Sequence, residues 1–223
     1  MKKIIVCLLV ALIAINGDAQ PVPGLFAGPQ MTSSKYTVLG AKQPTTWKTG
    51  FNAGFMMKVP FDNNLFFAPQ AFYSLKGYKV KFNQRAFPPD TLAIDNNTSI
   101  HTFELAALLQ YDFSKHAGFF IRFGPSLDFQ LFGNEKFHKT DNSTVDQKMK
   151  FDFVNYGRYG ASMHLHLGYE TKDGFVITAQ YTHGMGSINN ADYGPRIRHR
   201  VFGVTIGKYF KKKNMTMDTR NKE

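Results

Sequence analysis

Five ionisable side chains in this sequence could carry chemistry, and all five fall in segments where polar and apolar residues alternate. They are Glu104, Arg122, Asp128, His164 and His166. Side chains of a β-strand point alternately to opposite faces, so residues separated by an even number of positions share a face. Arg122 and Asp128 therefore share one face, and so do the two histidines. We expect the five to form a polar network on one side of a sheet.

The histidine pair could bind a metal, and Ser162 beside His164 could begin a nucleophilic pair. Zinc usually takes three or four protein ligands, and no third ligand accompanies the histidines. Serine hydrolysis needs a histidine and an orienting polar group around the nucleophile, and no such motif surrounds Ser162. Hydrogen bonding is the favoured role of these residues. We therefore predict no enzyme activity, no catalytic residue, no cofactor and no metal.

The element that positions Arg122 and Asp128 is the segment 119–131, in which every odd position is apolar. A period of two predicts a β-strand with one apolar face and one polar or small face. Thirteen residues exceed the ~5–6 of an ordinary strand. They reach the ~9–11 that a tilted strand needs to cross a bilayer. This segment therefore predicts a membrane-spanning strand.

Seven further segments have strand character, and the connections between them alternate between long and short. The seven are residues 24–32, 47–59, 65–75, 98–111, 151–169, 175–183 and 199–210. Short turns on one side and long loops on the other are typical of an up-and-down barrel inserted from the periplasm. The sequence therefore predicts an all-β fold, an eight-stranded antiparallel up-and-down transmembrane β-barrel.

Alternation alone does not say which face of the barrel is apolar. An eight-stranded barrel has an interior just wide enough to be filled by side chains, so small and polar residues such as Gly54, Ser126 and Gly160 fit inside. The alternative is a soluble periplasmic lipocalin-like barrel with the faces reversed and an apolar ligand inside. We favour the membrane form, because a wholly aromatic lining would overfill so narrow an interior.

In the membrane form, Glu104, Arg122 and Asp128 face the lumen from neighbouring strands. An unpaired charge in a narrow interior is costly, so we expect the three to pair with one another and close the lumen. An ion or proton path is the alternative. It is less favoured because eight strands leave little free space.

The N-terminus has the pattern of an export signal. A basic start at Lys2 and Lys3 precedes an uncharged apolar stretch, and small residues stand at Gly17 and Ala19. We expect residues 1–19 to be a cleaved signal peptide, 20–210 the barrel domain, and 211–223 a polar, disordered tail. Export and a transmembrane barrel together predict the outer membrane of a Gram-negative bacterium.

The chain is strongly basic, with a formal net charge of +11. An exported protein meets little nucleic acid, so we expect none as a partner and favour outer-membrane lipid instead. Arg196, Arg198 and Arg200 fall near the predicted outer rim, where they could contact the phosphates of a surface glycolipid. Ordinary solvated loop charge explains them equally well. A periplasmic or envelope protein is a further expected partner.

Three short motifs carry a resemblance to a known family. They are Gly-Phe-Asn-Ala-Gly at 50–54, Pro69 followed by Tyr-Ser-Leu-Lys-Gly at 73–77, and Phe-Gly-Pro at 123–125. Together they resemble the PorT-type outer-membrane β-barrel domain of Bacteroidota over essentially the whole mature chain. The resemblance implies an eight-stranded outer-membrane barrel with no established catalytic residues, and our own expectation for the chain is a structural or interaction role. For some relatives it also implies an association with gliding or type IX secretion.

This sequence departs from the PorT-type pattern in two places. Gln70 stands where many relatives carry an acid in the lumen. The chain also continues past Phe210, whereas outer-membrane barrels often end at a terminal aromatic residue that guides assembly. The second departure concerns the insertion signal and leaves the expected fold unchanged.

Overall fold

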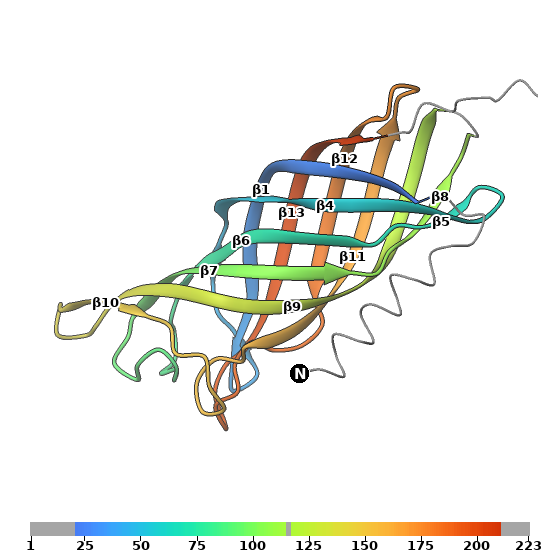
Figure 1. Ribbon diagram of the computed structural model, residues 1–223. Coiled ribbons are helices and arrows are strands. Elements are labelled where there is room, and N and C mark those ends of the chain that lie inside the picture. Colours follow the sequence, from blue (N-terminus) through green and yellow to red (C-terminus); the bar gives the residue numbers. More distant parts are fainter. Residues whose placement is uncertain (1–20, 115–116, 211–223) are drawn as a thin grey trace, which may run out of the picture.

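The computed structural model describes residues 21–114 and 117–210, which form one antiparallel β-sheet that closes on itself (Figure 1). Eight long strands, which we call staves, make up the ring, and two of them are interrupted. In chain order they are β1 (Val22–Val38), β4 (Lys48–Asp62), β5 with β6 (Leu65–Phe67, Gln70–Lys81), β7 with β8 (Asp95–Ala106, Leu109–Asp112), β9 (Gly118–His138), β11 (Tyr159–Glu170), β12 (Phe175–Gly184) and β13 (Arg196–Tyr209). Pairing of β13 with β1 closes the ring and confirms the expected fold class. The predicted signal peptide and C-terminal tail lie outside the described residues.

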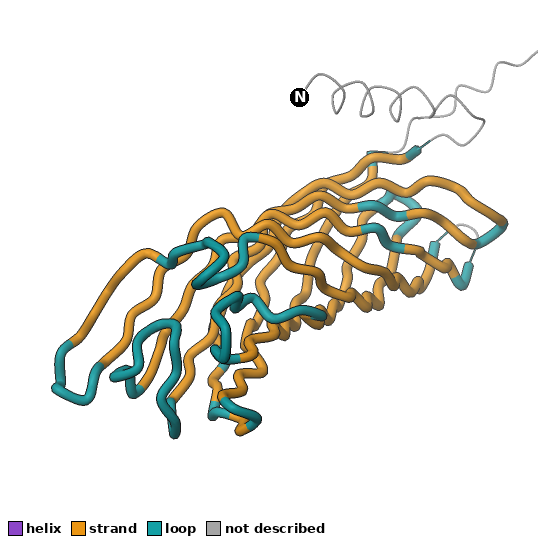
Figure 2. Tube along the Cα trace, turned by 90° about the horizontal axis from the view of Figure 1, so that it is seen from below, coloured by secondary structure: helices purple, strands orange, loops and turns teal. Residues whose placement is uncertain are grey.

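The connections differ in length at the two ends of the barrel. Residues 63–64 and 171–174 make short turns at one end, which we call the short-turn end, and β8 ends and β9 begins at the same end. Residues 39–47, 82–94, 139–158 and 185–195 make longer loops at the other, the long-loop end (Figure 2). These loops carry the short strands β2 (Ala41–Lys42), β3 (Thr45–Thr46) and β10 (Thr144–Lys148). The predicted alternation of connection lengths is therefore present.

The outer wall of the barrel is apolar around its middle. Phe55, Phe119 and Ile206 are 65–69% exposed, whereas Glu104 and Asp128 face inward and are at most 4% exposed. Soluble monomers rarely expose large continuous apolar patches. A lipocalin-like barrel requires the reverse arrangement, so that alternative is not favoured. No helix within the described part of the chain is long and apolar enough to cross a membrane.

Toward the long-loop end this pattern inverts. Tyr36 on β1, Tyr78 on β6 and Ile197 on β13 point inward and are fully buried, while Lys35 and Lys79 next to them are exposed. Polar outside and apolar inside is the pattern of a sheet that faces water. The barrel therefore continues past its apolar belt with a water-facing wall and its own apolar interior.

This inversion explains why several strands are longer than predicted. β1, β6 and β9 continue to Val38, Lys81 and His138, through residues that the sequence analysis assigned to loops. In β9 a bulge also shifts the register: Phe132 pairs with His101 and Gln130 with Thr102, which leaves Leu131 unpaired. The alternation changes parity there although the strand continues. In the opposite direction, the strand predicted from residue 151 begins only at Tyr159.

Side chains fill the interior at successive levels. One apolar cluster, the long-loop cluster, consists of Tyr36, Val38, Tyr78, Val80, Ala86, Ile100, Met149, Tyr156, Ile188 and Ile197. A second, the short-turn cluster, consists of Phe26, Met56, Ala68, Phe72, Ala106, Leu108, Phe120, Val176 and Tyr209. Polar residues occupy the level between them. The interior is therefore less uniformly small and polar than predicted.

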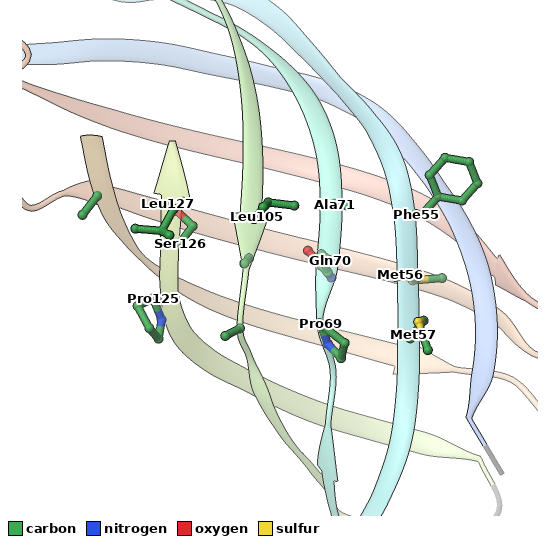
Figure 3. Close-up of a pocket in the computed structure, with 13 residues that line it drawn as sticks. Phe55, Met56, Met57, Pro69, Gln70, Ala71, Leu105, Pro125, Ser126 and Leu127 are labelled. Carbon is green, nitrogen blue, oxygen red and sulfur yellow. The ribbon is translucent and has the colours of Figure 1, made fainter. Parts of the chain in front are cut away.

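Two neighbouring staves are interrupted at one level of the outer wall, and the next one, β9, carries a proline there. The gap between β5 and β6 contains Pro69, the gap between β7 and β8 contains Ala107, and β9 carries Pro125 beside them. Proline has no N–H to donate to the ladder, which explains a break in strand pairing at Pro69. The proline carbonyls still accept, from Met57 N at 3.0 Å and Ala107 N at 2.9 Å. A shallow apolar groove of about 520 Å³ lies over these interruptions (Figure 3).

Candidate functional site

The central polar level is organised by Lys76 on β6. Its Nζ lies 2.9 Å from Glu104 Oε1 on β7 and 3.1 Å from Asp128 Oδ2 on β9. All three side chains are at most 5% exposed. Cross-strand pairing of Glu104 with Asp128 brings the two carboxylates together, and Lys76 neutralises one of the two charges.

Hydroxyl groups also form hydrogen bonds within this group. Ser126 Oγ donates to Asp128 Oδ1 and Ser162 Oγ donates to Asp128 Oδ2, both at 2.6 Å. Thr102 Oγ1 lies 3.3 Å from Glu104 Oε1 and donates to the Ser74 carbonyl at 2.8 Å. Hydrogen bonds to ionised groups are the stronger kind, so these contacts offset part of the cost of burying charge. The central group is thus a connected, buried network.

His164 belongs to this central group, and His166 lies beside it. His164 Nε2 lies 2.9 Å from Ser126 Oγ, and Nδ1 lies 3.0 Å from Thr182 Oγ1. Ser162 is bonded to Asp128 instead, so the Ser162–His164 pair considered from the sequence does not form. His166 is fully buried, and neither of its ring nitrogens has a hydrogen-bond partner among the described residues.

Arg122 does not join Glu104 and Asp128, contrary to the expected pairing. Its Nε donates to Gln110 Oε1 at 2.5 Å, its Nη2 donates to Tyr209 OH at 2.9 Å, and its guanidinium lies 4.2 Å from the centre of the Phe120 ring. Six positions along a strand correspond to about 20 Å, which separates Arg122 from Asp128 on β9. Shared parity correctly predicted that both residues face inward. Their separation along the strand puts them at different depths in the lumen.

A second group of charges lies near Arg122 at the short-turn end. Lys58 Nζ bridges Asp112 Oδ2 at 2.5 Å and Glu170 Oε2 at 2.7 Å. Gln110 links this group to Arg122, because its Nε2 donates to Asp112 Oδ1 at 2.6 Å. Both lysine bridges join carboxylates from different strands, so each ties several staves together through the lumen.

Lys76 and Lys58 were not predicted to belong to these groups. The predicted strand 65–75 ended one residue before Lys76, which therefore fell in a loop. The signal was present in the sequence, since Lys76 follows Ser74 at the same inward parity. Lys58 lies within the predicted strand 47–59, at the same parity as Gly54.

The three arginines expected at the outer rim all lie on β13, which begins at Arg196, three residues before the predicted strand. Arg196, Arg198 and Arg200 occupy successive outward positions, directly beyond outward-facing Phe202. They form a group separate from the lumen network. No set of three or more His, Cys, Asp or Glu side chains suited to a metal ion occurs in residues 21–114 and 117–210.

Comparison with known proteins agrees with the architecture. The family model described as "Outer membrane protein beta-barrel domain" matches residues 24–190. Among solved structures, the attachment invasion locus protein Ail of Yersinia pestis is 12% identical, with 86% of this chain and 99% of that chain covered and a TM-score of 0.44. OprG of Pseudomonas aeruginosa is 13% identical, with 88% and 99% covered and a TM-score of 0.43. Neisserial surface protein A is 12% identical, with 83% and 97% covered and a TM-score of 0.42. No curated protein matches the sequence.

Proposed function

Because this chain belongs to the outer membrane protein β-barrel domain family, we propose that it is an outer-membrane barrel with a structural or interaction role and a lumen closed to solutes. The single observation that carries the proposal is the filled interior. An open channel needs a continuous polar path, and eight strands leave little room for one.

The closure is built from contacts at several depths. At the short-turn end, Lys58 ties Asp112 to Glu170, and the short-turn cluster packs above them. Lys76 holds the central level together, and the long-loop cluster covers it. A solute would have to separate one buried ion-pair group, one partly buried ion-pair group and two apolar clusters.

Electrical recording tests this closure directly. The refolded protein is reconstituted into planar bilayers, with an open porin as the positive control and heat-dependent gel migration as proof of folding. We expect no unitary current steps beyond those of a protein-free bilayer. Reproducible steps that scale with protein concentration would overturn the closed-lumen proposal.

The loops supply the surface for an interaction role. Tyr193 and Phe153 are 96% and 93% exposed, and Leu39 is 80% exposed, all in connections at the long-loop end. Large side chains of this kind, aromatic ones above all, are common anchors of protein interfaces. Their exposure supports an envelope or surface partner that binds this end of the barrel.

The finer assignment, a PorT-type barrel of Bacteroidota that works beside secretion or gliding machinery, is part of this proposal. It rests on the three sequence motifs. Mild crosslinking in cells, followed by purification and mass spectrometry, tests it. We expect components of that machinery to be recovered with the wild type and to be depleted with Phe153→Ser and Tyr193→Ser together. Recovery of the barrel alone would remove the machinery link.

A further inference from the structure

A row of cations runs up the outer wall at the long-loop end. We call it the basic ladder, and it comprises Arg196, Arg198 and Arg200 on β13, Lys35 on β1 and Lys42 on β2. β13 and β1, which carry four of the five residues, are neighbours in the ring, and β12 flanks β13 on its other side (Figure 1). All five residues belong to the part of the barrel next to the long loops.

The ladder begins where the apolar belt ends. Outward positions of β13 are Ile206, Val204 and Phe202 on one side of this boundary, each about half exposed or more. Beyond it the outward positions are the three arginines. Ile197, the inward residue between Arg196 and Arg198, belongs to the long-loop cluster. The ladder therefore lies at the height of the lipid headgroups, on the side that an up-and-down barrel turns toward the cell exterior.

Strand register brings the five cations close together. Arg198 pairs with Lys35, and Arg196 pairs with Thr37, which also pairs with Lys42. Successive outward positions on a strand are about 7 Å apart and neighbouring strands about 5 Å apart. Lys35, Lys42, Arg196 and Arg198 also line one groove of about 640 Å³. Several positive charges thus face the same small volume.

No acid among the described residues forms an ion pair with this group. None of the ion pairs in residues 21–114 and 117–210 includes a member of the basic ladder. The Nε of Arg200 is buried there without a hydrogen-bond partner. Elsewhere at the same end of the barrel, Lys139 does form an ion pair, with Asp90 at 2.8 Å. Clustered cations repel one another, so a site of this kind favours an external anion.

A second groove continues from the ladder into the apolar belt. It has a volume of about 570 Å³ and lies over β1, β4, β11, β12 and β13. Met31, Tyr181 and Phe202 line it, and Phe202 pairs with both of the others. Phe202 is also the outward residue next to Arg200 on β13, so the apolar groove begins one outward position from the ladder. A ligand that matches both carries phosphate above and acyl chains below.

We propose that the basic ladder binds the phosphate groups of a phosphorylated glycolipid of the outer leaflet, with an acyl chain in the groove beside Phe202. Arginine presents a planar fork of donors that matches phosphate oxygens, which suits it to this role better than lysine. Binding takes place on the outer wall and does not depend on a closed lumen. A current recording that contradicted the closed lumen would therefore leave this proposal standing.

The test uses the refolded full barrel in neutral detergent and fluorescent lipid A, a bisphosphorylated diglucosamine glycolipid, as the probe. Two comparison ligands separate the sources of affinity: the same lipid without phosphates, and the bisphosphorylated sugar without acyl chains. We expect the complete lipid to bind most tightly, because it alone engages both the ladder and the apolar groove.

The decisive variant is Arg196→Gln with Arg198→Gln and Arg200→Gln. One basic residue at a membrane surface contributes about fivefold in affinity, so we expect the triple variant to bind roughly 100-fold more weakly. The matched control is Lys79→Gln with Lys81→Gln and Lys136→Gln, which removes the same charge from another part of the wall. We expect it to retain the wild-type affinity within about threefold. Replacing the same three arginines by lysine should restore part of the loss.

Each variant is first checked for folding by its heat-dependent migration on gels. Equal weakening in the Gln variant and its control would overturn the proposal, because net charge alone would then explain binding. Equal affinity for the acyl-free sugar would overturn the lipid assignment in favour of a soluble anion. If the Gln variant does not fold, wild-type binding decides instead: affinity that is unaffected by removal of the lipid phosphates would overturn the proposal.

Discussion

Replacing Lys76 by methionine should destabilise the barrel strongly. Methionine has a similar length but no charge, so the change leaves the carboxylates of Glu104 and Asp128 buried without the cation that bridges them at 2.9 and 3.1 Å. The hydroxyls of Ser126 and Ser162 remain bonded to Asp128 and relieve only part of this cost. The net charge of the three positions would then change from −1 to −2.

The size of the effect follows from the burial of all three groups. Breaking a buried ion pair by removing one partner costs about 3–5 kcal/mol in free energy of unfolding. At a denaturant dependence of about 2 kcal/mol per molar urea, the unfolding midpoint should fall by roughly 1.5–2.5 M. The triple variant Lys76→Met, Glu104→Gln and Asp128→Asn should recover most of this loss, because neutral amides carry no charge that needs a partner.

Urea unfolding in lipid vesicles measures both variants. Trp47, the one tryptophan of the chain, provides the fluorescence signal. It is 39% exposed, and its ring lies 5.6 Å from that of Phe202 at the edge of the apolar belt. A loss below about 1 kcal/mol for Lys76→Met would refute the reasoning about the buried bridge. So would a triple variant that is no more stable than the single one.

Two further predictions concern packing and the lipid-facing wall. Gly54→Val should cost at least about 1–3 kcal/mol, because a Cβ at Gly54 would lie 2.3 Å from the Cβ of Phe72. Gly186→Val should leave the stability unchanged, since no atom lies within 4 Å of the added Cβ. The two variants are compared by the fraction of heat-modifiable protein after refolding. Equal yields would contradict the packing argument. Leu127→Arg should cost about 2–4 kcal/mol on folding into vesicles if Leu127 faces lipid. Asn134→Arg, outward on the same strand but beyond the belt, should cost little, and similar penalties for both would mean that the belt has been misplaced.

The sequence was sufficient for the fold because a bilayer imposes a simple rule on strands that cross it. Outward residues must be apolar along the whole crossing, so segments such as 119–131 show a long period of two. The turns at 63–64 and 171–174 were equally readable from their asparagine, aspartate and glycine residues. Past the belt the rule no longer holds, and the strands that continue to Val38, Lys81 and His138 therefore looked like loops.

The sequence by itself thus determined which side chains face inward, since parity along one strand is a local property. Only the tertiary structure decided which of them meet. Depth in the lumen depends on the stagger between strands and on irregularities such as the bulge at Leu131, and neither is local. For that reason Glu104 and Asp128 share Lys76, while Arg122 bonds to Gln110 and Tyr209 at another depth. The basic ladder has the same origin, because closure of β13 against β1 is what sets Arg198 beside Lys35.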